Sequence, residues 1–146
     1  MELTSKQKGN VTELQCLTAF SQLGCIINIP YGDNARYDFI ADVNGKLLKI
    51  QVKTASLSKN SSDVICFSCR STYVNRKGTH NSRYSKNDID YFATYWENKC
   101  YIIPVNECST AKSLRFSIPS NGQVQGVSFA KDYELEFQLS KIGGSN

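Results

Sequence analysis

The sequence lacks the features of a membrane or secreted protein. None of its apolar runs approaches the roughly 20 residues that a helix needs to cross a bilayer, and its first residues contain no apolar segment typical of a secretory signal. Histidine is nearly absent: His80 is the only one among 146 residues, which disfavours sites built from several histidines. We therefore expect one cytoplasmic domain, residues 1–146, large enough for a hydrophobic core.

Acidic residues are missing from one long segment. The net charge of +4 is modest, but no Asp or Glu occurs between Asp63 and Asp88. A stretch of one charge sign that also contains aromatic, Asn, Ser and Thr side chains suits contact with a polyanion. The alternative is a solvated surface loop. Within this acid-free segment lie Arg70, Tyr73, Arg76, Lys77, His80, Arg83, Tyr84 and Lys86.

Six cysteines are present, but their spacing does not form a clear framework. Disulfides need an oxidising compartment, which nothing in the sequence implies. A structural zinc site needs two close ligand pairs, and only Cys66 and Cys69 have that spacing. Buried free thiols are the simpler interpretation. The cysteines are Cys16, Cys25, Cys66, Cys69, Cys100 and Cys108.

The strongest local signal is a β-hairpin around Asn44 and Gly45. Asn-Gly between two apolar-rich runs favours a two-residue hairpin loop, so that Asp38, counted outward from the loop, lies across from Gln51. Paired residues share a face and side chains alternate, which places Asp38, Gln51 and Lys53 together. A carboxylate, an amide and an ammonium group at one place suggest chemistry on a phosphate. The opposite face is apolar and is expected to form core: Phe39, Ala41, Val43, Leu48, Ile50 and Val52.

A further carboxylate lies in the apolar stripe of the first predicted helix, residues 8–24. At about 100° per residue, Glu13 falls between Leu17 and Phe20 on the helical wheel. A carboxylate on a core face is costly unless it is paired or bound to a metal. Glu13 is therefore expected either to reach solvent from the margin of the stripe, or to point across the core edge toward Asp38 and Lys53.

The remaining pattern predicts a mixed α/β fold around a small sheet. Residues 87–96 suit a helix, with Asn87 or Asp88 as its N-cap. The other expected elements are strands at residues 25–29, 63–74 and 99–105, loops at 56–62 and 75–86, a second hairpin from 114–118 and 123–129, and a polar tail.

As a set, several motifs resemble the core of the PD-(D/E)XK nucleases. Any one of them is weak, but their order and spacing make the similarity specific. They look most like the PD-(D/E)XK homing endonucleases encoded in bacterial group I introns. The resemblance implies a restriction-endonuclease-like fold, with a small mixed central sheet flanked by helices. The motifs lie at residues 9–13, 29–38, 51–54, 88–93 and 101–104.

Two positions depart from the motif that names the family. Tyr37 precedes Asp38 where the motif has Pro, which leaves the carboxylate in place. Gln51 stands where most of the superfamily has Asp or Glu. Its amide offers a hard cation an oxygen but no charge, so the site would contain two acids, Asp38 and Glu13. The intron-encoded branch is known for Gln at this position, so the departure does not imply an inactive enzyme.

The resemblance implies a metal-dependent endodeoxyribonuclease that makes site-specific double-strand breaks. Its metal, Mg²⁺ or Mn²⁺ as a substitute, would be bound by Asp38, Glu13, the Gln51 amide oxygen and the backbone carbonyl of Val52. Lys53 would orient the attacking water and stabilise charge at the phosphate. The implied catalytic residues are Glu13, Asp38, Gln51 and Lys53. The implied DNA contacts are Arg70, Tyr73, Asn75, Arg76, Lys77, His80, Arg83 and Lys86.

Cutting both DNA strands with one site per chain needs at least two copies. The resemblance implies a homotetramer, with a dimer as the alternative, acting in a bacterial cell. A Holliday-junction resolvase or a restriction enzyme on the same core is an alternative function. A non-catalytic DNA-binding protein is another, suggested by Gln51. The single histidine disfavours a zinc or HNH-type nuclease.

Overall fold

The computed structural model describes residues 1–142, except for the side chains of residues 73 and 74. Its centre is a five-stranded sheet in the order β1-β2-β3-β8-β9. Neighbouring strands are antiparallel, except that β3 and β8 run parallel. This is the small mixed sheet that the sequence predicts. Its strands are β1 (Ile26–Asn28), β2 (Phe39–Val43), β3 (Lys46–Val52), β8 (Tyr91–Trp96) and β9 (Lys99–Pro104).

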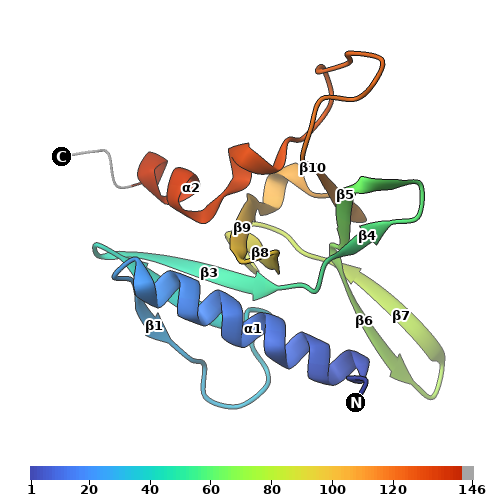
Figure 1. The fold of residues 1–146 in the computed structure, drawn as a ribbon. Coiled ribbons are helices and arrows are strands. Elements are labelled where there is room, and N and C mark those ends of the chain that lie inside the picture. Colours follow the sequence, from blue (N-terminus) through green and yellow to red (C-terminus); the bar gives the residue numbers. More distant parts are fainter. Residues whose placement is uncertain (143–146) are drawn as a thin grey trace.

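The two faces of this sheet are covered by different layers (Figure 1). Helices α1 (Ser5–Gln22) and α2 (Leu135–Ile142) cover one face, where Phe39, Ile50 and Leu139 belong to one buried cluster. A three-stranded sheet in the order β10-β5-β4 covers the other face and shares a second core with β8 and β9. Its strands are β4 (Ser56–Ser58), β5 (Ser61–Ser68) and β10 (Ala111–Arg115).

The hairpin of β2 and β3 has the predicted turn and register. Asn44 and Gly45 form its loop with φ angles of 53° and 92°, and the ladder runs from Val43 opposite Lys46 to Phe39 opposite Ile50. The positive φ angles explain the Asn-Gly pair, because few other residues adopt this conformation without strain. The predicted apolar face is confirmed, since five of its six residues are buried and Val43 packs against them.

Helix α1 begins three residues earlier than predicted. Thr4 and Gln7 form a capping box, in which each side chain accepts a hydrogen bond from the backbone N–H of the other residue. The helix ends at Gln22, and Gly24 follows with a φ of 86°. Phe20 is fully buried and stands edge-on to Phe39, with ring centroids 5.3 Å apart. This contact fixes the helix on the sheet.

The predicted helix at residues 87–96 is wrong, because this segment contains strand β8. Phe92, Ala93 and Thr94 are buried between β3 and β9 in the sheet. Aromatic and β-branched side chains favour such a strand. Asp88 caps no helix; its carboxylate accepts a hydrogen bond from the N–H of Ser85 and closes a turn.

The predicted loop at residues 75–86 is largely part of a β-hairpin. Strands β6 (Arg70–Asn75) and β7 (Gly78–Arg83) pair along their whole length and project from the body of the molecule (Figure 1). The predicted strand at 63–74 is divided at Cys69 between β5 and β6. The predicted loop at 56–62 contains β4 and the start of β5.

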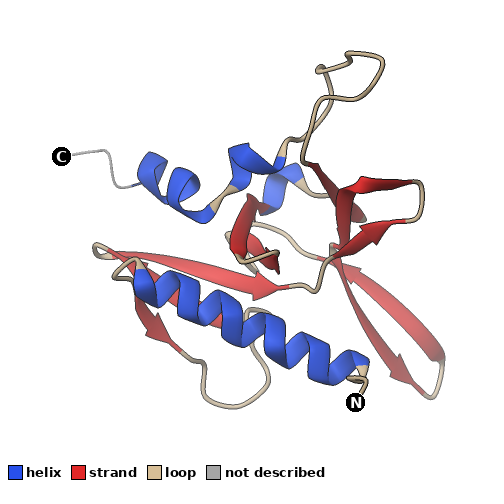
Figure 2. Cartoon of the chain, viewed as in Figure 1, coloured by secondary structure: helices blue, strands red, loops and turns tan. Residues whose placement is uncertain are grey.

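The C-terminal third also differs from expectation. Residues 114–118 and 123–129 do not form the predicted hairpin, because β10 pairs with β5 instead. Residues 116–128 form a loop. Arg115 and Phe129, which flank this loop, form an isolated bridge. The polar tail contains a 3₁₀ turn (Ala130–Tyr133) and α2, whose Leu135 and Leu139 are buried one helical turn apart. A second 3₁₀ turn, Val105–Glu107, follows β9. Figure 2 separates the helices and strands by colour.

All six cysteines are free, and four of them are buried, which confirms the interpretation as structural thiols. Among the described residues, no group of three or more His, Cys, Asp or Glu side chains is placed to bind a metal ion. The zinc alternative therefore finds no support. No helix within residues 1–142 is long and apolar enough to cross a membrane.

Candidate active site

Asp38 lies at the entrance to β2 and is fixed to the end of β3 by two hydrogen bonds. The ladder stops at Phe39, one step before the predicted pairing of Asp38 with Gln51. The Asp38 N–H donates to the Ile50 carbonyl at 2.8 Å, and its Oδ2 accepts from the Val52 N–H at 2.7 Å. The carboxylate therefore lies beside the end of β3, a strand in the interior of the sheet.

Glu13 belongs to α1. It is half-buried, and the nearby Asp38 charge together with burial raises the pKa of its carboxyl above the ordinary value, burial being the larger cause. Burial also raises the pKa of Asp38, against the opposing effects of the Val52 hydrogen bond and the Lys53 charge. Glu13 is thus partly buried and close enough to Asp38 to be affected by its charge, and its placement as a second acid of the site stays a prediction. A Thr12–Thr54 hydroxyl contact of 3.4 Å holds α1 near this end of β3.

Lys53 directly follows the last residue of β3 and lies near Asp38. Its Nζ donates a hydrogen bond of 2.7 Å to the backbone carbonyl of Arg70. Burial lowers the pKa of the Lys53 amine, and the Arg36 charge acts in the same direction, whereas Asp38 and Cys69 oppose them. The result is a partly desolvated amine beside a carboxylate, an arrangement common at catalytic centres.

The donor set suits a hard divalent cation. Two carboxylates with raised pKa values repel one another in a partly dry place, and a cation would relieve that repulsion. The Gln51 Nε2 donates a long hydrogen bond of 3.5 Å to the Val52 carbonyl oxygen, so the amide nitrogen faces that carbonyl. The two carboxylates are of the kind that binds a hard divalent cation.

Residues 3–136 match the family model of the PD-(D/E)XK endonucleases. The chain belongs to this family. It is accordingly an endonuclease, a hydrolase that acts on the phosphodiester bonds of DNA, and members of the family generally use divalent metal ions. No curated protein matches the sequence significantly.

The fold of this PD-(D/E)XK endonuclease is also similar to a solved structure. The bacterial homing endonuclease I-Ssp6803I superimposes with a TM-score of 0.76 over 99% of this chain and 100% of its own, at 24% sequence identity. At that identity the likeness establishes the fold.

The expected DNA contacts of the endonuclease are distributed along the β6–β7 hairpin. Arg76 and Lys77 are exposed at its turn, and Arg83 is exposed near its base. Asn75 is tied locally, because its Oδ1 accepts from the Lys77 N–H at 2.8 Å and lies 2.9 Å from His80 Nε2.

Three of the expected contacts differ from these. Arg70 is half-buried, and its Nε is buried without a hydrogen-bond partner in the part of the chain described. Lys86 is exposed but lies beyond the hairpin. The side chain of Tyr73 lies outside the described residues. Arg76 and Lys77 therefore form a basic tip of the hairpin, and Arg70 and Lys86 lie apart from this tip.

Two residues near the site were not assigned from the sequence. Arg36 donates hydrogen bonds to the Arg83 carbonyl at 2.8 Å and to Asp88 Oδ2 at 2.9 Å. Its guanidinium lies over the ring of Tyr84, 4.1 Å from the centroid. The only signal was proximity in sequence, because Arg36 precedes Asp38 by two positions and Tyr84 lies in the acid-free segment.

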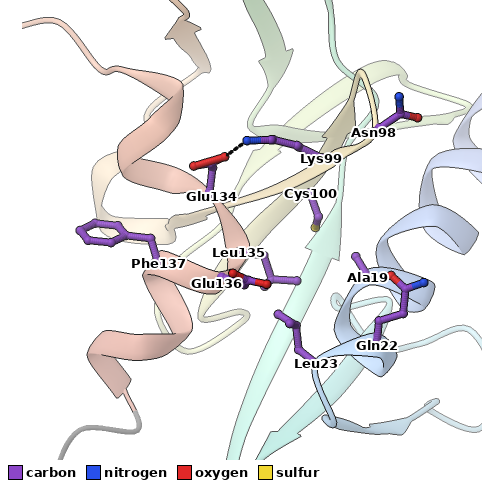
Figure 3. Close-up of a pocket in the computed structure, with 10 residues that line it drawn as sticks. All are labelled: Ala19, Gln22, Leu23, Asn98, Lys99, Cys100, Glu134, Leu135, Glu136 and Phe137. Atoms are coloured by element: carbon purple, nitrogen blue, oxygen red, sulfur yellow. Dashed lines mark hydrogen bonds and ion pairs between the residues drawn. The ribbon is translucent and has the colours of Figure 1, made fainter.

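A cavity of about 710 Å³ lies away from these residues, between α1, the β8–β9 turn and α2 (Figure 3). Lys99 and Glu134 form an ion pair at its wall. None of the candidate catalytic side chains lines it.

Proposed function

We propose that this endonuclease is a homing endonuclease of a bacterial group I intron, which cuts both strands of a specific DNA site by Mg²⁺-dependent hydrolysis. The observation that carries the proposal is the attachment of Asp38 to the end of β3, next to Lys53, whose Nζ is hydrogen-bonded to Arg70 at the base of a projecting basic hairpin. The similarity to a bacterial homing endonuclease supports the choice within the family. Its place of action would be the bacterial cytoplasm, where chromosomal DNA is accessible.

Four oxygen donors would bind the metal. Asp38 would be the principal ligand. The hydrogen bond from the Val52 N–H to its Oδ2 fixes the carboxylate and leaves Oδ1 for the metal. Glu13 joins directly or through water, and the Gln51 amide and Val52 carbonyl complete the set. When bound, Mg²⁺, or Mn²⁺ in its place, supplies charge stabilisation at the phosphate and acidifies water.

Lys53 would hold the attacking water beside the scissile phosphate. One of its three N–H donors is used by the Arg70 carbonyl, which leaves two for the water and a phosphate oxygen. Because burial lowers its pKa, a larger fraction of the amine is neutral at a given pH than for an exposed lysine. That favours a part in proton transfer as well as in charge stabilisation.

Target recognition would use the β6–β7 hairpin. The major groove of B-DNA admits a two-stranded β-ribbon, and β6 and β7 form such a ribbon with Arg76 and Lys77 at its tip. Arginine side chains can read guanine, and lysines set phosphate contacts. The proposed contacts remain Arg70, Tyr73, Asn75, Arg76, Lys77, His80, Arg83 and Lys86.

Double-strand cleavage would need an assembly. Each chain brings one set of Glu13, Asp38 and Lys53, so two strands need two chains. We propose a homotetramer, with a dimer as the smaller possibility, and light scattering on the purified protein distinguishes the two.

The deciding experiment is cleavage of plasmids that carry candidate intron-insertion sequences. The wild-type protein is expected to linearise one of them when Mg²⁺ is added and not in chelator. Lys53→Ala is expected to lower the rate by about 10²- to 10⁴-fold, the range for loss of a proton-transfer group. Preferential cutting of four-way junctions over linear duplex would contradict the homing assignment and favour a resolvase. Binding without cleavage of any plasmid would favour a DNA-binding protein.

A further inference from the structure

The base of the β6–β7 hairpin is attached to the active site through backbone carbonyls on both strands. Arg70 and Arg83 are paired across the first rung of the hairpin. The Arg70 carbonyl accepts a hydrogen bond from Lys53 Nζ at 2.7 Å, and the Arg83 carbonyl accepts one from Arg36 Nη1 at 2.8 Å. Two cationic side chains from the catalytic region therefore hold the two strands at one level.

Arg36 fixes more than this one carbonyl. Its Nη2 donates to Ser82 Oγ at 3.1 Å, and its Nη1 also pairs with Asp88 Oδ2 at 2.9 Å. The same Asp88 oxygen accepts from the N–H of Ser85 at 2.9 Å. The planar guanidinium thus ties the end of β7 to the turn that leads into β8, a task for which a flexible ammonium group is poorly suited.

Tyr84 separates and orients the two cations. The Arg36 guanidinium lies 4.1 Å, and Lys53 Nζ 5.5 Å, from the centre of its ring. The ring itself stands edge-on to Phe92, with centroids 5.2 Å apart, and Phe92 is buried in the core. Phe92 in β8 thus holds the Tyr84 ring in place, and the ring in turn holds Arg36, Lys53 and the hairpin base.

We propose that Arg36 and Tyr84 are positioning residues that hold the DNA-contacting hairpin in fixed register with Lys53, and so determine which phosphate is cut. The inference rests on the proposed function, in which the hairpin binds DNA and Lys53 acts at the scissile phosphate. Loss of either residue leaves the tip of the hairpin intact. Without that residue, the hairpin and the DNA bound to it vary in position relative to Lys53.

The test measures single-turnover cleavage at saturating enzyme and maps the cut ends. The probe is an end-labelled duplex containing the position that the wild-type protein cuts in a plasmid. Arg36→Gln and Tyr84→Leu are expected to lower the saturated rate by about 10- to 100-fold, the size of effect for small misplacements of reacting groups. Both are expected to spread the cuts over neighbouring phosphates. Tyr84→Phe, which keeps the ring, is expected to retain the single cut.

Two matched variants separate this role from loss of charge or affinity. Lys131→Gln removes one positive charge from an exposed site outside the nuclease centre and is expected to behave as wild type. Arg76→Gln, at the tip of the hairpin, is expected to raise the DNA dissociation constant. If Arg36→Gln and Tyr84→Leu raise only that dissociation constant and keep one sharp cut, the positioning role is wrong.

Hydrogen–deuterium exchange of the metal-free protein tests the same contacts without cleavage. Amides at residues 70–71 and 82–85 are expected to exchange faster in Arg36→Gln and Tyr84→Leu than in Lys131→Gln. Unchanged exchange there would overturn the inference. A Lys53→Ala protein that cleaves at the wild-type rate contradicts the proposed function instead, so the two failures are distinguishable.

Discussion

Asp38 and Glu13 are held partly away from water and close to each other's charge. Burial is the larger cause of the raised pKa of both carboxyl groups. A group with a raised pKa in the folded state binds more protons folded than unfolded, so its contribution to stability grows as the pH falls through that pKa. At neutral pH the ionised pair therefore destabilises the metal-free protein.

We predict that Asp38→Asn raises the melting temperature of the metal-free protein at neutral pH while abolishing cleavage. The amide can still accept the Val52 hydrogen bond, and it removes the desolvated charge. The gain over wild type is expected to shrink as the pH falls below the raised pKa, because wild type is then protonated as well. Calorimetry between pH values of about 3 and 7 measures the difference, and Asp132→Asn, on an exposed residue, is the control.

At the residue scale, the sequence predicted the neighbours of the site better than their exact arrangement. Alternation along a strand brought Asp38, Gln51 and Lys53 together, and that argument depends only on the hairpin loop. The argument did not predict that the β2–β3 ladder ends at Phe39. There the Asp38 side chain, in place of a backbone carbonyl, accepts the hydrogen bond from the Val52 N–H. Arg36 was missed because its partners lie 46 to 52 positions away in sequence.

At the element scale, α1 depends on its contact with the sheet. Phe20 is fully buried against Phe39, whereas Leu14 on the outer side of the helix is 63% exposed. We predict that Phe20→Ala lowers the free energy of unfolding by about 3–5 kcal/mol, as for other buried aromatic truncations. Leu14→Ala is expected to change it by no more than about 0.5 kcal/mol. Urea denaturation followed by circular dichroism compares the two, and equal losses would contradict the packing.

The tip of the β6–β7 hairpin should act mainly through charge. We predict that Arg76→Ala and Lys77→Ala each weaken DNA binding across sequences and lower the slope of log affinity against log salt by about 1. Fluorescence anisotropy over a salt series in metal-free buffer gives the slope. A slope equal to that of wild type would show that these side chains do not reach phosphates, while a loss confined to one target sequence would indicate base reading.

Elements with a local signal were predicted, and those defined by tertiary contacts were not. The Asn-Gly turn and the glycine after α1 are local features, and both elements were found. Strand β8 was taken for a helix, because Asp88 resembles an N-cap although it closes a turn with Ser85. The β6–β7 hairpin has little apolar alternation, since its sides face solvent, and so its strands carry no clear period.

At the scale of the whole molecule, the proposed assembly predicts that cutting both DNA strands depends on more than one chain. We predict that mixed assemblies of wild-type and Lys53→Ala chains, co-expressed with different tags and purified through both, nick supercoiled plasmid and linearise it poorly. Gel electrophoresis distinguishes nicked circles from linear DNA. Wild-type assemblies are expected to yield linear product with little nicked intermediate. Full linearisation by the mixed protein would show that one chain cuts both strands.

The attachment of the β6–β7 hairpin has a consequence for how such an enzyme changes its target. The bonds from Lys53 and Arg36 are made to backbone carbonyls of Arg70 and Arg83, which any amino acid at those positions would supply. The residue type at positions 70 and 83 can therefore change while these two bonds are kept, whereas the bond from Arg36 to Ser82 depends on the Ser82 side chain. Under the proposed function, the sequence that the ribbon reads can change at these two positions while its attachment beside Lys53 is retained.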